Sequence, residues 1–96
     1  MKLHELSYFF ECYNIPSLRY LYPTNLDLWN AFNKQEGKKI KVDILNEIEK
    51  ILKSKEDEQK QVMKYLNQIG VMGPIRFKKT TKMLSFLTEM KENITI

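Results

Sequence analysis

Apolar residues recur along this chain at intervals of three and four, which is the period of an amphipathic α-helix. In the first such run Leu3, Leu6, Phe10 and Tyr13 share one helical face, and Pro16 ends it. A short Ser-Leu-Arg-Tyr-Leu-Tyr segment follows this proline. The pattern predicts about five main helices, at 2–14, 25–35, 43–54, 56–69 and 81–93.

Residue types that cap helices stand before most of these segments. The side-chain oxygen of a capping residue accepts a hydrogen bond from a free backbone N–H of the first helical turn. The predicted capping residues are Thr24 or Asn25, Asp43, Ser54, and Thr80 or Thr81.

The boundary between the third and fourth helices has two interpretations. Ser54 followed three residues later by Asp57 favours the start of a new helix. However, Lys53-Ser54-Lys55 contains no glycine or proline, so one continuous helix across 43–69 is the alternative.

Two short basic segments, 39–42 and 75–78, alternate polar and apolar residues. This alternation is typical of a half-buried strand, although an extended linker fits it equally well. An isolated pair of strands is stable only when it packs on other elements. We therefore expect at most a minor two-stranded ribbon within a mainly helical domain.

Length and composition favour one all-α, or nearly all-α, domain covering residues 1–96. The chain has 96 residues, of which 43% are hydrophobic, and only three are glycine and three proline. These numbers suit one core and leave too few turn residues for a sandwich or barrel of short strands. We expect a compact bundle of about five short helices.

Aromatic residues are concentrated in the first third of the chain. Eight of the eleven lie there, and large rings of this kind stabilise a small core when they are buried. The main interpretation is that they form the core, and the alternative is an exposed patch that anchors a partner protein. The eight are Tyr8, Phe9, Phe10, Tyr13, Tyr20, Tyr22, Trp29 and Phe32.

Few residues are suited to catalysis or metal binding. His4 is the only histidine and Cys12 the only cysteine, which is too few for a metal centre or a thiol nucleophile with its base. We expect His4 to be partly exposed and Cys12 to be a small buried apolar residue. The acidic groups 47/49 and 56–58 stand among lysines and are interpreted as solvated helix faces. The prediction is a non-enzymatic protein with no catalytic residue, cofactor or metal.

Compartment and membrane association are predicted from what the chain lacks. One cysteine cannot form an intramolecular disulfide, and His4 and Glu5 interrupt any apolar signal region, which favours the cytoplasm. No stretch approaches the 18 or so consecutive apolar residues of a spanning helix. We therefore expect a soluble protein without a membrane partner.

Positive charge is concentrated in one stretch. The net charge is +4, and residues 59–88 contain six basic residues and no acidic one. A helix, a glycine turn and the basic start of a second helix resemble the general layout of a helix-turn-helix, although the connector is too long for it. Backbone contacts to nucleic acid are predicted for Lys60, Lys64, Arg76, Lys78, Lys79, Thr80, Thr81 and Lys82.

Two binding functions therefore remain open. The first is a nucleic-acid-binding regulator that uses the basic segment 60–82. The second is a protein-binding module or inhibitor, of a mobile-element or viral type, that acts on a larger partner protein. Both fit a small, lysine-rich chain that lacks catalytic groups.

Overall fold

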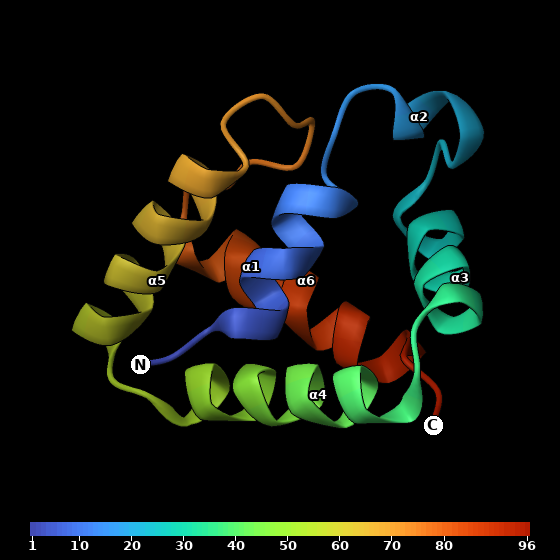
Figure 1. Ribbon diagram of the computed structural model, residues 1–96. Helices are drawn as coiled ribbons and strands as arrows, with labels where there is room; N and C mark the ends of the chain where they lie inside the picture. Colours follow the sequence, from blue (N-terminus) through green and yellow to red (C-terminus); the bar gives the residue numbers. More distant parts are fainter.

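Helix α1 (His4–Cys12) lies at the centre of the structure, a computed structural model that describes residues 1–96 (Figure 1). In the view of Figure 1, α5 and α3 stand on either side of α1, α4 runs beneath it and α6 crosses behind it. The structure has six helices and no strand, which confirms the all-α prediction. The remaining helices are α2 (Leu18–Leu21), α3 (Asn25–Gln35), α4 (Lys38–Lys53), α5 (Glu56–Ile69) and α6 (Thr80–Asn93).

The core forms around the aromatic residues of α1. The Phe9 ring stacks on Tyr13 with centroids 5.4 Å apart and meets Phe32 of α3 edge to face at 5.8 Å. Phe10 contacts Phe86 of α6 at 6.0 Å. The main interpretation of the aromatic cluster is thus confirmed for most of its members. Tyr20 is the clear exception, because 91% of it is exposed.

Trp29 is also part of this core, where its ring lies 5.7 Å from that of Phe86. Its indole Nε1 is buried and has no hydrogen-bond partner, and it is the one buried side-chain polar atom in this condition. Apolar packing therefore holds this ring in place without help from a polar contact.

Helix α4 begins five residues earlier than the sequence pattern predicts. Residues 39–42 belong to this helix, and the expected ribbon with 75–78 is wrong. Ile40 lies one turn before Ile44 and continues its apolar stripe, while Lys39 forms a 3.6 Å ion pair with Asp43 on the outer face. Asp43 is consequently an interior residue of α4, and the N-cap is Gly37.

Helices α4 and α5 are separate. Ser54 and Lys55 are extended, with ψ angles of 167° and 158°. Ser54 does not cap α5 as predicted, because its hydroxyl donates to the Ile51 carbonyl oxygen at 2.7 Å and so closes the end of α4. Gln59 donates from α5 to the same carbonyl oxygen at 3.1 Å. Hydrogen bonds to free carbonyl groups therefore end the helix where no glycine or proline does.

Of the two remaining predicted caps, the one at the start of α3 is confirmed and the one at the start of α6 is wrong. Thr24 accepts from the Asp27 backbone N–H at 3.1 Å, and the Asp27 carboxylate accepts from the Thr24 backbone N–H, so α3 starts with a capping box. Neither Thr80 nor Thr81 caps α6, because the N-cap is Lys79 and no side chain bonds there.

Glu47 is buried, contrary to the solvated face predicted for it. Its two carboxylate oxygens accept from the backbone N–H groups of Glu5 and Leu6, each at 3.0 Å. These are free donors in the first turn of α1, where a negative charge is also favoured by the helix dipole. Only 9% of Glu47 is exposed. A carboxylate of α4 thus caps the central helix from outside its own sequence.

The opposite end of α1 is tied to α3 by a second carboxylate. Glu36, the C-cap of α3, accepts hydrogen bonds from the hydroxyls of Tyr8 and Tyr13. This hydrogen bond to the carboxylate, more than burial, raises the pKa of Tyr8 to about 12. Burial and the same carboxylate raise the pKa of Tyr13 further.

The buried carboxyl of Glu47 makes the stability depend on pH in an unusual direction. Burial raises its pKa above the ordinary value of 4.5, against the lowering effect of its two backbone hydrogen bonds. A raised folded-state pKa means that protonation favours folding. This contribution is complete below the unfolded pKa and is lost as pH rises through the folded pKa. We expect a carboxyl titration by NMR to place the midpoint of Glu47 above 4.5.

The matched comparison is Glu47→Gln against Glu49→Gln. Glu49 lies on the same helix in surface ion pairs with Lys53 and Lys91, so its change should cost less than about 1 kcal/mol. Glu47→Gln turns an amide N–H₂ toward a backbone donor and should cost about 1–3 kcal/mol in urea unfolding at neutral pH. Its deficit against the wild type should grow as pH falls toward 4.5. An NMR titration midpoint of Glu47 at or below 4.5 would contradict the raised pKa.

Candidate binding surface

The connector between α5 and α6, residues 70–79, is held on the end of α1 by one asparagine. Asn14 is buried, and its side-chain amide donates to the Ile75 carbonyl oxygen at 3.0 Å and accepts from the Ile75 N–H at 2.8 Å. A Cβ on Gly73 would overlap Asn14, and one on Gly70 would lie 2.6 Å from Asn14 Nδ2. The connector therefore needs glycine at both positions to approach Asn14 this closely.

A second asparagine repeats this arrangement two residues later. Asn67 of α5 donates to the Phe77 carbonyl oxygen at 2.8 Å and accepts from the Phe77 N–H at 2.9 Å. Ile75 and Phe77 point into the core, whereas Arg76 is exposed. The alternating segment 75–78 is not helical here, and asparagine amides take the place of a partner strand.

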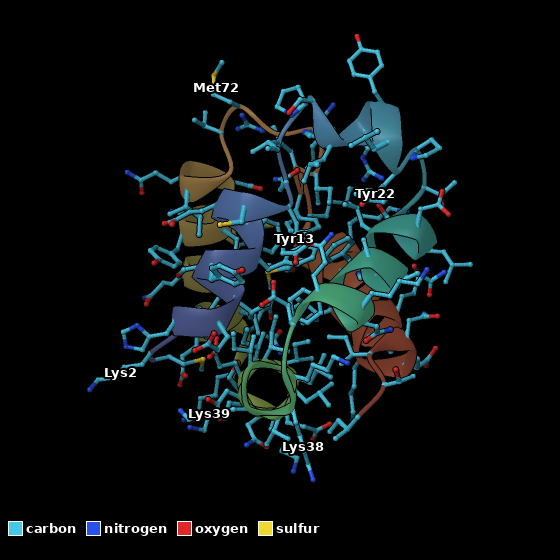
Figure 2. The ribbon with its side chains drawn as sticks, turned by 45° about the vertical axis from the view of Figure 1, so that its right-hand side comes forward. Lys2, Tyr13, Tyr22, Lys38, Lys39 and Met72 are labelled. Atoms are coloured by element: carbon cyan, nitrogen blue, oxygen red, sulfur yellow. The ribbon has the colours of Figure 1, made fainter.

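These contacts place two exposed apolar groups at the same end of the molecule, at the top of Figure 1. Tyr20 and Leu21 of α2 are 91% and 70% exposed, and Val71 and Met72 of the connector are 54% and 79% exposed. Pro16, Tyr20 and Pro74 line one shallow depression between the two segments. Figure 2 shows Met72 projecting outward at this end. We call Tyr20, Leu21, Val71 and Met72 the tip surface.

A basic hollow of about 400 Å³ adjoins the tip surface. Its charged lining residues come from three parts of the chain: Arg19 in α2, Arg76 in the connector, and Lys82 and Glu89 in α6. Arg19 Nη2 donates to Asn25 Oδ1 at 2.6 Å, and Arg76 Nη1 donates to the Val71 carbonyl oxygen at 3.3 Å. Burial lowers the pKa of Arg19. The structure independently shows Arg19 to be only partly exposed.

The structure brings only part of the predicted nucleic-acid segment together. Arg76 and Lys82 share the hollow, whereas Lys60 and Lys64 lie on α5 and do not line it. Lys60 forms a 3.6 Å ion pair with Glu56. Among the other predicted residues Thr80 is half-buried, and the exposed ones are Lys64, Lys78, Lys79 and Thr81.

Several residues of this end were not predicted. Arg19 and Asn25 of the hollow and Met72 of the tip surface come from segments without a recognisable motif. One signal for Arg19 was present, because it is the only charged residue between Cys12 and Leu26. The exposure of Tyr20 agrees with the alternative interpretation of the aromatic residues as a partner-binding patch.

Cys12 is exposed, so its predicted burial is wrong. The buried stripe of α1 is formed by Leu6, Phe9 and Phe10, and Cys12 lies two residues past it on another side of the helix. Partial desolvation raises the pKa of its thiol, which lowers its reactivity. No three His, Cys, Asp or Glu side chains lie close enough together to hold a metal ion.

None of the six helices is both long and apolar enough to cross a lipid bilayer. Comparison of the chain with protein-family models, with curated proteins and with solved structures finds no match.

The close approach of Gly73 to Asn14 can be tested by adding one methyl group. Gly73→Ala would force Asn14 or the connector to move, and overpacking of this kind costs about 1–3 kcal/mol. Hydrogen exchange at the Ile75 and Phe77 amides should also become faster. The control is Gly37→Ala, where a new Cβ meets nothing within 4 Å. If the two variants had equal free energies of unfolding and equal rates of amide hydrogen exchange, the close packing of Gly73 against Asn14 would be contradicted.

Proposed function

We propose that this protein is a non-enzymatic module that binds a partner protein through the tip surface. The observation that carries the proposal is the exposure of four large apolar side chains on two segments that meet at one end of the fold. Exposed apolar side chains on neighbouring segments at one end of a fold are typical of protein interaction sites. Tyr and Met are also among the residues enriched at interfaces.

The support beneath the tip surface strengthens the proposal. Asn14 holds the connector at Ile75, and the Gly73 N–H donates to the Gly70 carbonyl oxygen at 2.9 Å, so Val71 and Met72 lie in a turn with an internal hydrogen bond. Preorganisation of this kind reduces the entropy lost on association. A single unpaired cysteine also fits a protein that acts in a reducing compartment such as the cytoplasm.

Site-specific crosslinking in cells that produce the protein tests the proposal. A photoreactive phenylalanine analogue placed at Tyr20 or at Met72 should give an adduct with the same partner protein at both positions. The control position is Ile96, which is also exposed but lies at the chain end after α6. The double variant Tyr20→Ser, Met72→Ser should reduce capture of that partner about tenfold or more, since each buried anchor contributes more than about 1 kcal/mol.

Three results would reject this function. The first is that adducts at Tyr20 and Met72 are no stronger than those at Ile96. The second is that Tyr20 and Met72 give adducts with different proteins. The third is that the folded double variant captures the partner as well as the wild type does. Circular dichroism establishes whether the variant is folded. Both replaced side chains are largely exposed, so the helical spectrum should be retained.

A second candidate function is binding to the nucleic-acid backbone. It is favoured by the absence of acidic residues over 59–88 and by the position of Arg76 and Lys82 on one hollow. Exposed Lys and Arg neutralise phosphates and release counterions, so such binding weakens steeply with salt. The contacts would be made to backbone phosphates and would read little sequence.

Titration of labelled duplex DNA and RNA at two salt concentrations tests this second function. Four to six phosphate contacts predict a slope of about −4 to −5 in log affinity against log salt. Replacement of Arg76, Lys78 and Lys79 by Ala should reduce the slope by up to about three units. The matched control replaces Lys50, Lys53 and Lys55, which lie among acidic residues. No binding at low salt would exclude the function.

A further inference from the structure

The chain contains only two arginines, and they line the same hollow although they are 57 residues apart in the sequence. The other basic residues of the chain are fourteen lysines. Arg and Lys are not equivalent, because the planar guanidinium presents several N–H donors in a geometry that matches oxyanions. The fold has therefore gathered its best oxyanion-binding groups at one place.

Neither arginine is neutralised within the protein. The four ion pairs of the structure are all made by lysines, and none includes Arg19, Arg76, Lys82 or Glu89. Both guanidinium groups are instead oriented by neutral oxygens: Arg19 donates to Asn25 Oδ1 and to the Pro23 carbonyl oxygen, and Arg76 donates to the Val71 carbonyl oxygen. Each uses few of its five N–H donors in this way. The remaining donors and both charges are free for a ligand.

Burial makes this lack of a counter-charge more significant. Arg19 is only partly exposed, and a partly desolvated cation is stabilised by an anion more strongly than one in open solvent. The loss of solvent is what lowers the pKa of Arg19, and a bound anion would reverse that effect.

The charge of the hollow indicates the ligand. Three cations and the Glu89 carboxylate leave two net positive charges at its lining. A phosphate monoester carries about −1.5 to −2 near neutral pH and has three acceptor oxygens. We propose that the hollow formed by Arg19, Arg76 and Lys82 is a binding site for the phosphoryl group of a phosphate monoester. Glu89 disfavours a ligand that cannot supply two negative charges.

This site differs from both functions proposed above. The tip surface is apolar, whereas the hollow accepts a charged group beside it. The nucleic-acid backbone consists of phosphodiesters, each with one negative charge, whereas the hollow matches a doubly charged terminal group. A nucleotide and a phosphorylated side chain both carry such a group, so they are two sources of the same chemistry.

NMR of the arginine side chains provides a direct test, since a ¹⁵N-labelled sample has only two arginine Nε–Hε signals. We expect inorganic phosphate, adenosine monophosphate and phosphoserine each to shift both arginine signals. For each ligand the two signals should give the same dissociation constant, on the order of 1 mM or below. Binding should weaken below about pH 6, where the monoester loses its second charge. Dimethyl phosphate, which is a monoanionic diester, should bind about tenfold more weakly or not at all.

Matched substitutions separate a built site from general attraction. Arg76→Gln should weaken phosphate binding about tenfold, because it removes the charge-assisted hydrogen bonds from the guanidinium to the phosphate. Lys64→Gln makes the same change of charge outside the hollow and should alter the affinity less than about twofold. Arg19→Gln provides an independent loss of binding, and its circular dichroism shows whether it folds.

The outcomes are distinct from those of the crosslinking and salt experiments. Tighter binding of adenosine monophosphate or of phosphoserine than of inorganic phosphate supports the site and identifies its source. The proposal is overturned if no ligand shifts the arginine signals, if dimethyl phosphate binds as well as phosphate, or if Lys64→Gln weakens binding as much as Arg76→Gln.

Discussion

The pairing of asparagine side chains with backbone groups is the interaction on which the non-helical parts of this structure depend. A primary amide presents one donor and one acceptor side by side, which matches the N–H and C=O of an extended residue. Asn14 satisfies Ile75 in this way, and Asn67 satisfies Phe77. Asn33 joins the end of α6 to the chain beyond it, because it donates to the Asn93 carbonyl oxygen and accepts from the Thr95 N–H. Buried backbone groups would otherwise be left unpaired, since no strand is present.

Carboxylates have the corresponding role for the helices around α1. Glu47 accepts from the free N–H groups at its beginning, and Glu36 accepts from the two tyrosine hydroxyls that project from it. Both acids come from other helices, so the central helix is connected to α4 and α3 by charge as well as by packing. The aromatic contacts of Phe9 supply the apolar part of the same junction.

Local signals in the sequence predicted much of this fold and little of its binding surface. The bounds of α3 and α5 agree with the prediction, because both helices carry local signals. A capping box marks the start of α3, and a glycine marks the end of α5. The start of α4 was missed because residues 39–42 alternate polar and apolar side chains, a pattern that favours a strand or an extended linker, although they form the first turns of a helix. The burial of Glu47 and the proximity of Arg19 to Arg76 are tertiary facts. The first depends on a contact between residues about 40 positions apart, and the second on residues 57 positions apart. The local spacing of apolar residues carries no information about contacts over such separations.

The connector separates residues that maintain the fold from residues that are exposed at the surface. Gly70, Gly73, Ile75 and Phe77 are constrained by Asn14, by Asn67 or by the core. Val71 and Met72, which lie between the two glycines, are largely exposed and contribute little to the core. Substitutions at these two positions can therefore change the chemistry of the exposed surface while the backbone that presents them stays the same. A chain organised in this way can acquire new binding specificities through a few exposed residues, at little cost to its stability.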